Sequence, residues 1–258
     1  MHNKRIVIKI GTSSLTYPNG KLNLQRIQRL AWVLTDLRNE GNELVLVSSG
    51  AIAVGSDRLG LSERPRDIVG RQAASAVGQA VLMQIYENFF MEYNQKVAQI
   101  LLTKDVVEDP VRKNHAFNTL KALLDMGVIP IVNENDTVSV DELGFSDNDT
   151  LSAYVVTLAK GDLLIILSDI DGLYDADPRK CKEAKLIHSV NPFDPALEQW
   201  ASGAGTDFGT GGMATKVIAA KMAASQNIPT VVANGEDPAV LFCIIKGEEV
   251  GTYFDAAK

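Results

Sequence analysis

A glycine-rich segment that ends in a lysine carries the strongest chemical signal in this 258-residue sequence. It reads Gly209-Thr210-Gly211-Gly212-Met213-Ala214-Thr215-Lys216 and runs into a predicted helix over residues 214–226. Glycines let backbone N–H groups approach a ligand closely, and a helix N-terminus attracts anions. Lys216 falls in the first turn, where the helix dipole disfavours a cation. The pattern predicts a phosphate site, with a plain connecting loop as the alternative.

A second lysine, Lys9, interrupts an otherwise apolar and β-branched run over residues 6–10, which predicts a buried parallel strand. A turn over residues 11–14 follows at once. Ligands of open α/β sheets bind at the carboxyl ends of strands, so Lys9 is well placed for function. The alternative is a lysine whose stem packs while its head reaches solvent.

Hydroxyl and glycine residues follow the second predicted strand, over residues 43–47. The segment reads Ser48-Ser49-Gly50-Ala51. Such residues are common in turns. At the carboxyl end of a strand they can equally offer hydroxyl and N–H donors to a substrate. The sequence leaves both interpretations open.

Two clusters of acidic and amide side chains follow the predicted strand over residues 128–132. They read Asn133-Glu134-Asn135-Asp136-Thr137 and Asp147-Asn148-Asp149-Thr150, joined by a connection over residues 138–145 that is compatible with a small hairpin. A helix cap supplied by Asp147 or Asp149 explains one or two of these residues. Neither cluster contains a basic residue. Carboxylates beside amides suit an ammonium group, as in an amino acid, and one carboxylate can also organise the lysines.

The predicted strand over residues 163–167 ends in Ser168-Asp169, and further acidic residues continue to Asp177. A calcium loop is an alternative interpretation of this segment, but the closing glutamate of an EF-hand is missing.

The remaining elements complete an alternation of strands and helices. Further helices are predicted over residues 23–40, 67–92 and 114–126, and further strands over residues 97–102, 228–232 and 251–254. This order predicts a three-layer αβα sandwich with a mainly parallel central sheet, formed as a single domain over residues 1–258. Small residues in the middle of the helix over 67–92 permit close packing or a subunit interface, and we expect a homo-oligomer, dimer or tetramer.

Composition excludes several classes of function. The chain has 25 basic and 32 acidic residues and a net charge of −7, which disfavours a nucleic-acid-binding surface. Two cysteines and three scattered histidines cannot supply a disulfide framework or a clustered metal site. No segment reads as a signal peptide or a membrane span, so we expect a cytoplasmic protein without membrane contact.

Taken together and in order, these motifs resemble the glutamate 5-kinases of the amino acid kinase superfamily, over nearly the whole chain. The resemblance rests on the following segments: Lys9 to Ser13, Ser48 to Ile52, Asn133 to Asp136, Asp147 to Asp149, Ser168-Asp169 with Gly172-Leu173-Tyr174, and Gly209 to Lys216. Many members of that family carry a C-terminal PUA domain, which we expect to be absent here.

The resemblance implies phosphorylation of the side-chain carboxylate of L-glutamate by ATP with Mg²⁺, the first step towards proline. It also implies residue roles. Lys9 and Lys216 would contact the phosphates, Asp149 would orient both lysines, and Ser49, Asp136 and Asn148 would bind glutamate. The nucleotide site would be lined by Lys9, Ser168, Asp169, Thr210, Gly211, Gly212, Met213, Ala214, Thr215 and Lys216. Mg²⁺ would be held largely by the ATP phosphates, so no metal-binding residue is predicted.

The same resemblance implies feedback inhibition by proline, and it implies that the next enzyme of the proline pathway can receive the labile acyl phosphate. Three alternatives remain. One is another kinase of the superfamily, acting on acetylglutamate, aspartate or a nucleoside monophosphate. The second is a nucleotide-binding regulator without turnover, which the presence of both lysines and Asp149 disfavours. The third is a dehydrogenase, although no G-x-G-x-x-G follows the first strand.

Overall fold

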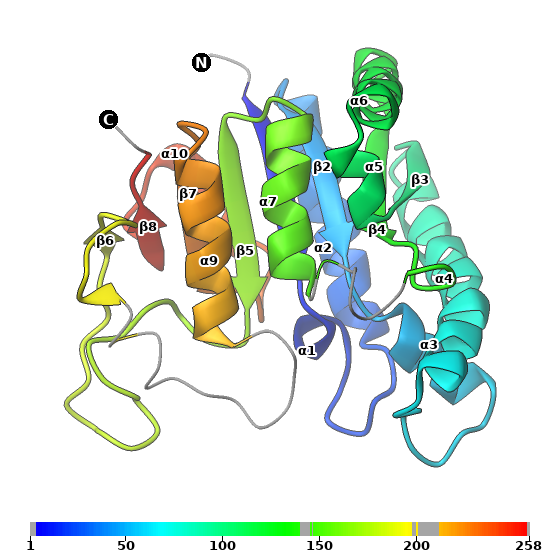
Figure 1. The fold of residues 1–258 in the computed structure, drawn as a ribbon, viewed down its shortest axis with the longest axis horizontal. Coiled ribbons are helices and arrows are strands. Elements are labelled where there is room, and N and C mark those ends of the chain that lie inside the picture. Colours follow the sequence, from blue (N-terminus) through cyan, green and yellow to red (C-terminus); the bar gives the residue numbers. More distant parts are fainter. Residues whose placement is uncertain (1–3, 140–144, 146, 198–199, 201–211, 257–258) are drawn as a thin grey trace.

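The computed structural model describes residues 4–139, 145, 147–197, 200 and 212–256. Within them, the strands form one sheet in the order β3-β4-β2-β1-β5-β7-β8-β6 (Figure 1). Their bounds are β1 (Arg5–Ile10), β2 (Glu43–Ser48), β3 (Val97–Leu102), β4 (Ile129–Glu134), β5 (Leu163–Ser168), β6 (Ser189–Val190), β7 (Thr230–Asn234) and β8 (Thr252–Phe254). Only β7 and β8 pair antiparallel, so the predicted mainly parallel sheet is confirmed.

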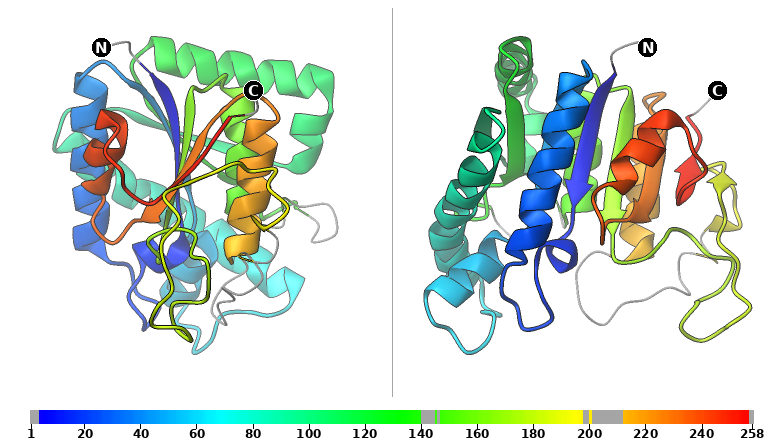
Figure 2. Two further views of the ribbon diagram at one scale, coloured as in Figure 1. Left: turned by 90° about the vertical axis from the view of Figure 1, so that its left-hand side faces the viewer. Right: turned by 180° about the vertical axis from the view of Figure 1, so that it is seen from behind.

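Helices cover both faces of this sheet, which confirms the three-layer αβα arrangement (Figures 1 and 2). Their bounds are α1 (Thr12–Leu15), α2 (Leu24–Asn39), α3 (Ala51–Arg58), α4 (Ile68–Met91), α5 (Lys104–Glu108), α6 (Pro110–Asp125), α7 (Asn148–Leu158), α9 (Met213–Ala224) and α10 (Val240–Lys246). One core lies between the sheet and the layer of α6, α7 and α9. The other lies between the sheet and the layer of α2, α4 and α10.

The alternation of side chains along β1 decides where Lys9 points. Ile6, Ile8 and Ile10 belong to the core beneath α2, whereas Val7 belongs to the core beneath α7 and α9. Successive side chains of a strand face opposite sides of the sheet. Lys9 therefore shares the face of Val7 and points into the layer of α7 and α9.

The sheet also has a topological switch beside β1. This strand pairs with β2 on one side and with β5 on the other, both in parallel. The chain leaves β1 towards β2 and returns later to β5, so a crevice opens at the carboxyl ends of β1 and β5. In Figure 1 this is the lower edge of the sheet, towards which the arrow of β5 points. Lys9 lies next to the last residue of β1 at this edge.

The predicted long elements are present within one to four residues of their expected ends, but five short ones were not predicted: α1, α3, α5, α10 and β6. The segment Ser48-Ser49-Gly50-Ala51 contains a much shorter turn than expected. Ser48 ends β2 and Ala51 already begins α3, with Gly50 as N-cap at φ +104°. The reversal needs only this one glycine in the left-handed region.

Two glycines explain the close packing of α3 on α4. A methyl group added at Gly55 would lie 1.8 Å from the carbonyl oxygen of Ala74, and one added at Gly78 would lie 1.8 Å from that of Ala51. Any side chain at either position would push the helices apart. The small residues of α4 therefore serve a contact within the chain, as one of the two sequence interpretations predicted.

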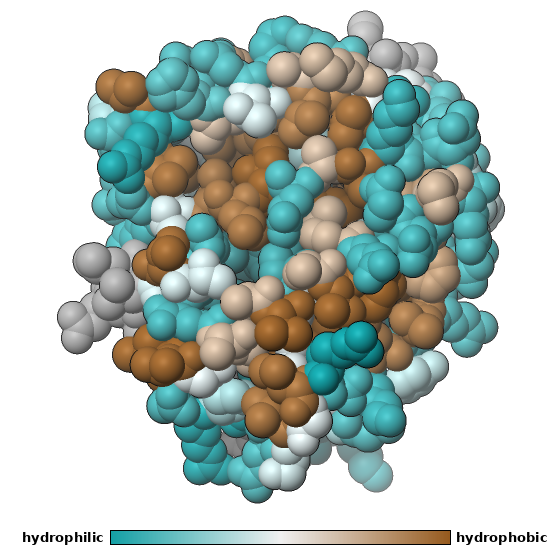
Figure 3. All heavy atoms as spheres, turned by 90° about the vertical axis from the view of Figure 1, so that its right-hand side faces the viewer, coloured by the Kyte–Doolittle hydropathy of each residue, from teal (hydrophilic) through white to brown (hydrophobic). Residues whose placement is uncertain are grey.

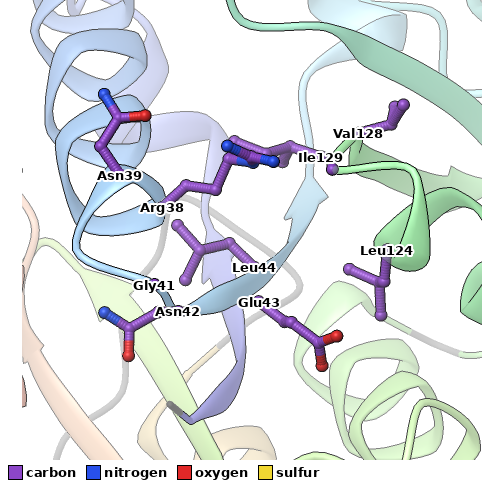
Figure 4. A pocket seen from close by; sticks show the side chains of 10 residues that line it. Arg38, Asn39, Gly41, Asn42, Glu43, Leu44, Leu124, Val128 and Ile129 are labelled. Carbon is purple, nitrogen blue, oxygen red and sulfur yellow. The ribbon is translucent and has the colours of Figure 1, made fainter. Parts of the chain in front are cut away.

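A cavity of about 350 Å³ lies at the opposite edge of the sheet, between the ends of α2 and α6 and the starts of β2 and β4 (Figure 4). The guanidinium group of Arg38 lines this cavity and lies against Gly127, where an added methyl group would be 1.9 Å from Arg38 Nη2. Both helices end here, and helix C-termini favour a cation. Arg38 supplies that cation, so the cavity is well explained as a structural contact.

Candidate active site

Two lysines and an aspartate form a buried cluster at the carboxyl edge of the sheet. Lys9 Nζ lies 2.6 Å from Asp149 Oδ1, and Lys216 Nζ lies 3.1 Å from Asp149 Oδ2. The three residues come from β1, α7 and α9 and are far apart in sequence. Asp149 has no exposed surface, and the two lysines are 6% and 3% exposed. The structure thus brings together the three residues for which the sequence predicted catalytic roles.

Burial and charge act against each other in this cluster. Burial would raise the pKa of Asp149, but the charges of Lys9 and Lys216 outweigh it and hold that pKa below its usual value. Burial lowers the pKa of Lys216, and the attraction of Asp149 offsets part of this effect. One carboxylate between two ammonium groups leaves a net positive charge. The cluster can therefore receive a further anion.

The N-terminus of α9 borders the same cluster. Gly212 is the N-cap, without a side-chain hydrogen bond to the first turn, and Lys216 is the fourth residue of the helix. The Thr215 hydroxyl lies 2.8 Å from both Asp149 Oδ2 and the carbonyl oxygen of Gly212. Met213 is buried, and Ala214 is an exposed residue of the first turn. Thr210 and Gly211, also predicted to bind nucleotide, lie outside the described residues.

Ser168 and Asp169 lie at the carboxyl end of β5, on the other side of the crevice from β2. Ser168 is buried, and its hydroxyl is 3.2 Å from Asp169 Oδ1. The charge of Asp169 also reaches Lys216, whose pKa it raises slightly against the effect of burial. Asp169 therefore lies within electrostatic reach of the lysine cluster, and the nucleotide-binding role expected for Ser168 and Asp169 stays a prediction.

A network of side-chain amides lies beside the lysine cluster, because Asn148 and Asp149 are the first two residues of α7. Asn148 Nδ2 donates to the carbonyl oxygen of Ser48 at 2.8 Å, and it lies 2.8 Å from Ser49 Oγ and 3.0 Å from Asn133 Oδ1. Ser49 and Asn148, two predicted substrate residues, are thus in direct contact. Asn148 directly precedes Asp149, the residue whose carboxylate holds both lysines.

Asp136, the third predicted substrate residue, is bound from α4. The Ser75 hydroxyl donates to Asp136 Oδ2 at 2.8 Å. Burial raises the pKa of Asp136, and the Ser75 hydrogen bond moderates that rise. The neighbouring Asp147 serves a different purpose, because its side chain accepts a hydrogen bond from the backbone N–H of Thr150 and caps α7. Of the two carboxylates suggested as the cap, Asp147 has this role and Asp149 does not. The connection 138–145 lies largely outside the described residues.

Two further polar residues at this site, Ser75 and Gln79, were not predicted, and Asn133 was predicted only as a member of the first acidic and amide cluster. Asn133 Nδ2 donates to Gln79 Oε1 at 2.9 Å, and Gln79 and Asn133 are both buried. Ser75 binds Asp136 as described above. A signal for two of them was present: Ser75 and Gln79 are four residues apart in a helix that is otherwise mostly apolar. Polar residues that share one face of an apolar helix indicate a buried polar contact.

The described residues contain no group of three or more His, Cys, Asp or Glu side chains that could hold a metal ion. The acidic residues after Asp169 make turn contacts instead, such as the 2.8 Å hydrogen bond from the backbone N–H of Lys185 to Asp175 Oδ1. None of the described helices has the length and apolar character needed to traverse a lipid bilayer.

The sequence matches a known protein family and several known relatives over most of its length. The family model described as "Amino acid kinase family" matches residues 4–234. A glutamate 5-kinase from Clostridium perfringens is 54% identical, over 99% of this chain and 96% of its own length. A glutamate 5-kinase from Listeria monocytogenes serotype 4b is 51% identical, over 100% of this chain and 95% of its own length.

Solved structures with the same fold are much more distant in sequence. A UMP kinase from Bacillus anthracis has a TM-score of 0.67 at 20% identity and covers 99% of this chain and 97% of its own. An isopentenyl phosphate kinase from T. acidophilum has a TM-score of 0.66 at 19% identity and covers 97% and 99%. At these identities the likeness concerns the fold alone.

Proposed function

The chain belongs to the amino acid kinase family and, within it, to the glutamate 5-kinases, and on that premise we propose how its site works. The chain catalyses ATP-dependent phosphorylation of the side-chain carboxylate of L-glutamate, giving L-glutamyl 5-phosphate. The observation that carries the proposal for the site is the buried carboxylate of Asp149 between two lysines, 2.6 Å from one and 3.1 Å from the other.

The reaction depends mainly on stabilisation of the negative charge of the transferring phosphoryl group. A carboxylate is already nucleophilic at neutral pH, so no general base is required. One oxygen of the glutamate side chain forms a bond to the γ-phosphorus of ATP, and the bond from that phosphorus to the β,γ-bridging oxygen breaks to release ADP. Lys9 and Lys216 stabilise the charge on the transferring group, and Asp149 keeps both ammonium groups in place. The N–H groups at the start of α9 bind the nucleotide phosphates.

The residues present fit ATP and Mg²⁺. The lysine cluster has a net positive charge, and among the described residues a methyl group added at Gly212 would meet no atom within 4 Å, which leaves room for an anion beside the start of α9. Mg²⁺ held by the phosphates would supply additional positive charge to the transferring group. Ser168 and Asp169, at the end of β5, line the nucleotide side of the crevice in this proposal, together with the segment over residues 210–216.

Glutamate recognition is proposed for Ser49, Asp136 and Asn148. The Asp136 carboxylate has one oxygen bound to Ser75 and can direct the other towards an ammonium group. The Asp136 carboxylate and the amides suit an ammonium group. The charges of Arg64 and Arg71, which lower the pKa of Asp136 against the effect of burial, suit a carboxylate, so the pocket has both kinds of group that an amino acid needs.

Proline shares the α-carboxylate and the cationic nitrogen of glutamate but lacks the reactive side-chain carboxylate. We propose that it occupies the same pocket around Asp136 and Asn148 and inhibits the reaction without being phosphorylated.

The acyl phosphate product is labile, and direct transfer to the next enzyme of the proline pathway would protect it. A single amino acid kinase domain over residues 1–258 and a cytoplasmic location agree with these substrates.

A homo-oligomer is proposed from the outer face of α4 and the free edge of β3. Only seven of the 24 residues of α4 are buried, yet only two of the 24 are charged, Arg71 and Glu87. Val69 and Met91 are 73% and 65% exposed. β3 is the terminal strand of the sheet, and an extended hydrophobic area covers this side of the molecule (Figure 3). A helix that is apolar all round is usually covered on both sides. Light scattering of the Val69→Asp variant, compared with the unmutated chain, tests this interface.

The test of function is formation of an acyl phosphate. The purified chain is incubated with ATP, Mg²⁺ and hydroxylamine, and hydroxamate is measured with glutamate, aspartate and acetylglutamate as separate acceptors. Phosphorylation of UMP would give a phosphoanhydride, which forms no hydroxamate, so its turnover is followed by the release of ADP. We expect hydroxamate with glutamate alone. Turnover of another acceptor in place of glutamate would assign the chain a different acceptor, and no turnover with any would favour a nucleotide-binding regulator.

A further inference from the structure

The amide network beside the lysine cluster has a direction that can be worked out from one backbone carbonyl. A carbonyl oxygen can only accept hydrogen bonds. The Asn148 atom 2.8 Å from the carbonyl oxygen of Ser48 must therefore be the NH₂ group. The Asn133 atom that faces this NH₂ group at 3.0 Å must then be its oxygen. It follows that the NH₂ group of Asn133 faces Gln79, which must present its own oxygen.

This order leaves one atom of Asn148 for a substrate. Its NH₂ group has only two hydrogens, and three acceptors lie within 3.0 Å: the Ser48 carbonyl, Ser49 Oγ and Asn133 Oδ1. The donors of Asn148 are therefore saturated. For its oxygen Oδ1, no partner is found among the described residues. An acceptor oxygen without a partner can receive a hydrogen bond from a cationic N–H group but not from a carboxylate. Asn148 Oδ1 is therefore suited to bind an ammonium group.

We propose that Gln79 is a positioning residue for substrate recognition: through Asn133 it supports the direction of the Asn148 amide that the Ser48 carbonyl favours, so that Asn148 Oδ1 accepts from the ammonium group of glutamate. This inference rests on the proposed function and deepens it. Gln79 touches neither the substrate nor the lysines. It acts from α4, where it follows Gly78 and is held by the close contact of that glycine with α3.

Burial makes the relay of amides from Gln79 through Asn133 to Asn148 sensitive to the loss of one member. Gln79 is 8% exposed and Asn133 is 4% exposed, so water cannot readily replace a lost partner. Without the oxygen of Gln79, the NH₂ group of Asn133 is left buried and unpaired, which is costly. Rotation of the Asn133 amide by 180° then becomes favourable. That rotation turns an NH₂ group towards the NH₂ group of Asn148. Asn148 then keeps only the Ser48 carbonyl and Ser49 Oγ as acceptors and is held less firmly in its present direction.

The test uses Gln79→Met, which keeps a similar volume but has no amide oxygen. We expect KM for glutamate to rise about tenfold, the order expected for a weakened hydrogen bond to a charged group. KM for ATP should be unchanged. Glutarate, which has both carboxylates of glutamate but no amino group, serves as the probe. Its inhibition constant should change less than about twofold, because its binding does not use Asn148 Oδ1.

Two further variants separate the relay from packing. Gln79→Glu retains an acceptor oxygen and should keep KM for glutamate within about threefold of the unmutated value. Gln25→Met makes the same substitution at an exposed position of α2, away from α4, and should leave KM for glutamate unchanged. If Gln79→Met does not fold, Asn133→Asp provides the second test. Its carboxylate still accepts from Asn148 and can accept from the Gln79 amide, so KM should again stay within about threefold.

The outcomes are distinguishable. An unmutated chain that forms no acyl phosphate from glutamate overturns both the proposed function and this inference. An active chain in which Gln79→Met weakens glutamate and glutarate equally, or neither, overturns the inference alone. A selective loss for glutamate, restored in Gln79→Glu, supports it.

Discussion

The Oδ1 atom of Asp149 lies 2.6 Å from the Nζ atom of Lys9, and this contact joins the second residue of a helix to the fifth residue of a strand that precedes it by 140 positions. The second oxygen of the same carboxylate holds Lys216 at 3.1 Å. A carboxylate shared in this way fixes the separation of two ammonium groups that would otherwise repel each other. The arrangement agrees with a site for charge-dense phosphoryl groups.

Replacing either lysine should slow the chemical step. Lys9→Ala or Lys216→Ala should lower kcat by on the order of a hundredfold or more, because each ammonium group stabilises charge that develops during transfer. Steady-state rates with saturating glutamate and ATP measure the effect, and circular dichroism checks the fold. Lys4→Ala, at an exposed lysine near the start of β1, is the control. Near-normal kcat in both variants would rule out the proposed roles.

Removing the charge of Asp149 should destabilise the protein. Asp149→Asn leaves two buried ammonium groups without their counter-charge, and breaking a buried pair typically costs about 3–5 kcal/mol. The folded protein holds the pKa of Asp149 below its ordinary value of 3.8. The contribution of its carboxylate is thus present above pH 3.8 and is lost as the pH falls through the lower folded pKa.

Urea unfolding at pH 7 and at several acidic pH values measures this effect. The unmutated chain and Asp149→Asn should differ most near neutrality, and their unfolding free energies should converge in acid. A constant difference across the whole range would mean that Asp149 contributes by packing and not by its charge.

The sequence patterns predicted which residues lie at this site, but they left the roles of two of them, Asp147 and Asp149, undecided. The run of residues 6–10 and the glycine-rich segment predicted both lysines at positions that the structure brings together. Asp147 and Asp149, however, are equally good helix caps by residue type. Only the rotation of about 100° per residue around the helix start decides between them. That rotation sends Asp147 to the backbone N–H of Thr150 and Asp149 to the lysines.

The supporting shell was harder to predict than the site residues. Gln79 contacts Asn133 across 54 positions, and no local pattern shows which buried amide pairs with which. The short helix α3 was missed because a single glycine, Gly50, makes the whole turn before it. β6 has only two residues and is defined by its pairing with β8, a contact that period-two patterns in one segment cannot reveal.

Glutamate binding should depend on the protonation of Asp136. Burial raises the pKa of this carboxyl group, and the Ser75 hydrogen bond lowers it. KM for glutamate should therefore rise as the pH falls through the raised pKa of Asp136. In Ser75→Ala the moderating hydrogen bond is lost, so the rise should begin at higher pH. KM for ATP over the same pH range is the control. Identical pH profiles in both proteins would show that Asp136 does not bind the ammonium group.

The contact of α3 with α4 should not tolerate a single methyl group. Alanine is a better helix former than glycine by about 1 kcal/mol, so Gly78→Ala would stabilise an exposed helix. Here the new methyl group would lie 1.8 Å from the carbonyl oxygen of Ala51. We expect a loss of about 1–3 kcal/mol instead. KM for glutamate should also rise, since Gln79 is the next residue. Thermal unfolding gives the sign, and an increase in Tm would contradict the described packing.

Proline should compete with glutamate and not with ATP. The two amino acids share an α-carboxylate and a cationic nitrogen, and the proposed pocket around Asp136 and Asn148 recognises the nitrogen that they have in common. Initial rates measured against proline at several glutamate concentrations should therefore give an apparent inhibition constant that rises with glutamate. The same constant should stay unchanged when ATP is varied.

Two variants described above test where proline binds, because one changes the proposed amino acid pocket and the other changes the lysine cluster. Gln79→Met disturbs the acceptor oxygen of Asn148 and should weaken proline and glutamate together, since both present a cationic nitrogen to it. Lys9→Ala removes charge from the phosphoryl site and should leave proline binding, measured by calorimetry, nearly unchanged. Proline inhibition that glutamate cannot relieve, or that survives unaltered in Gln79→Met, would place the inhibitor at a separate site.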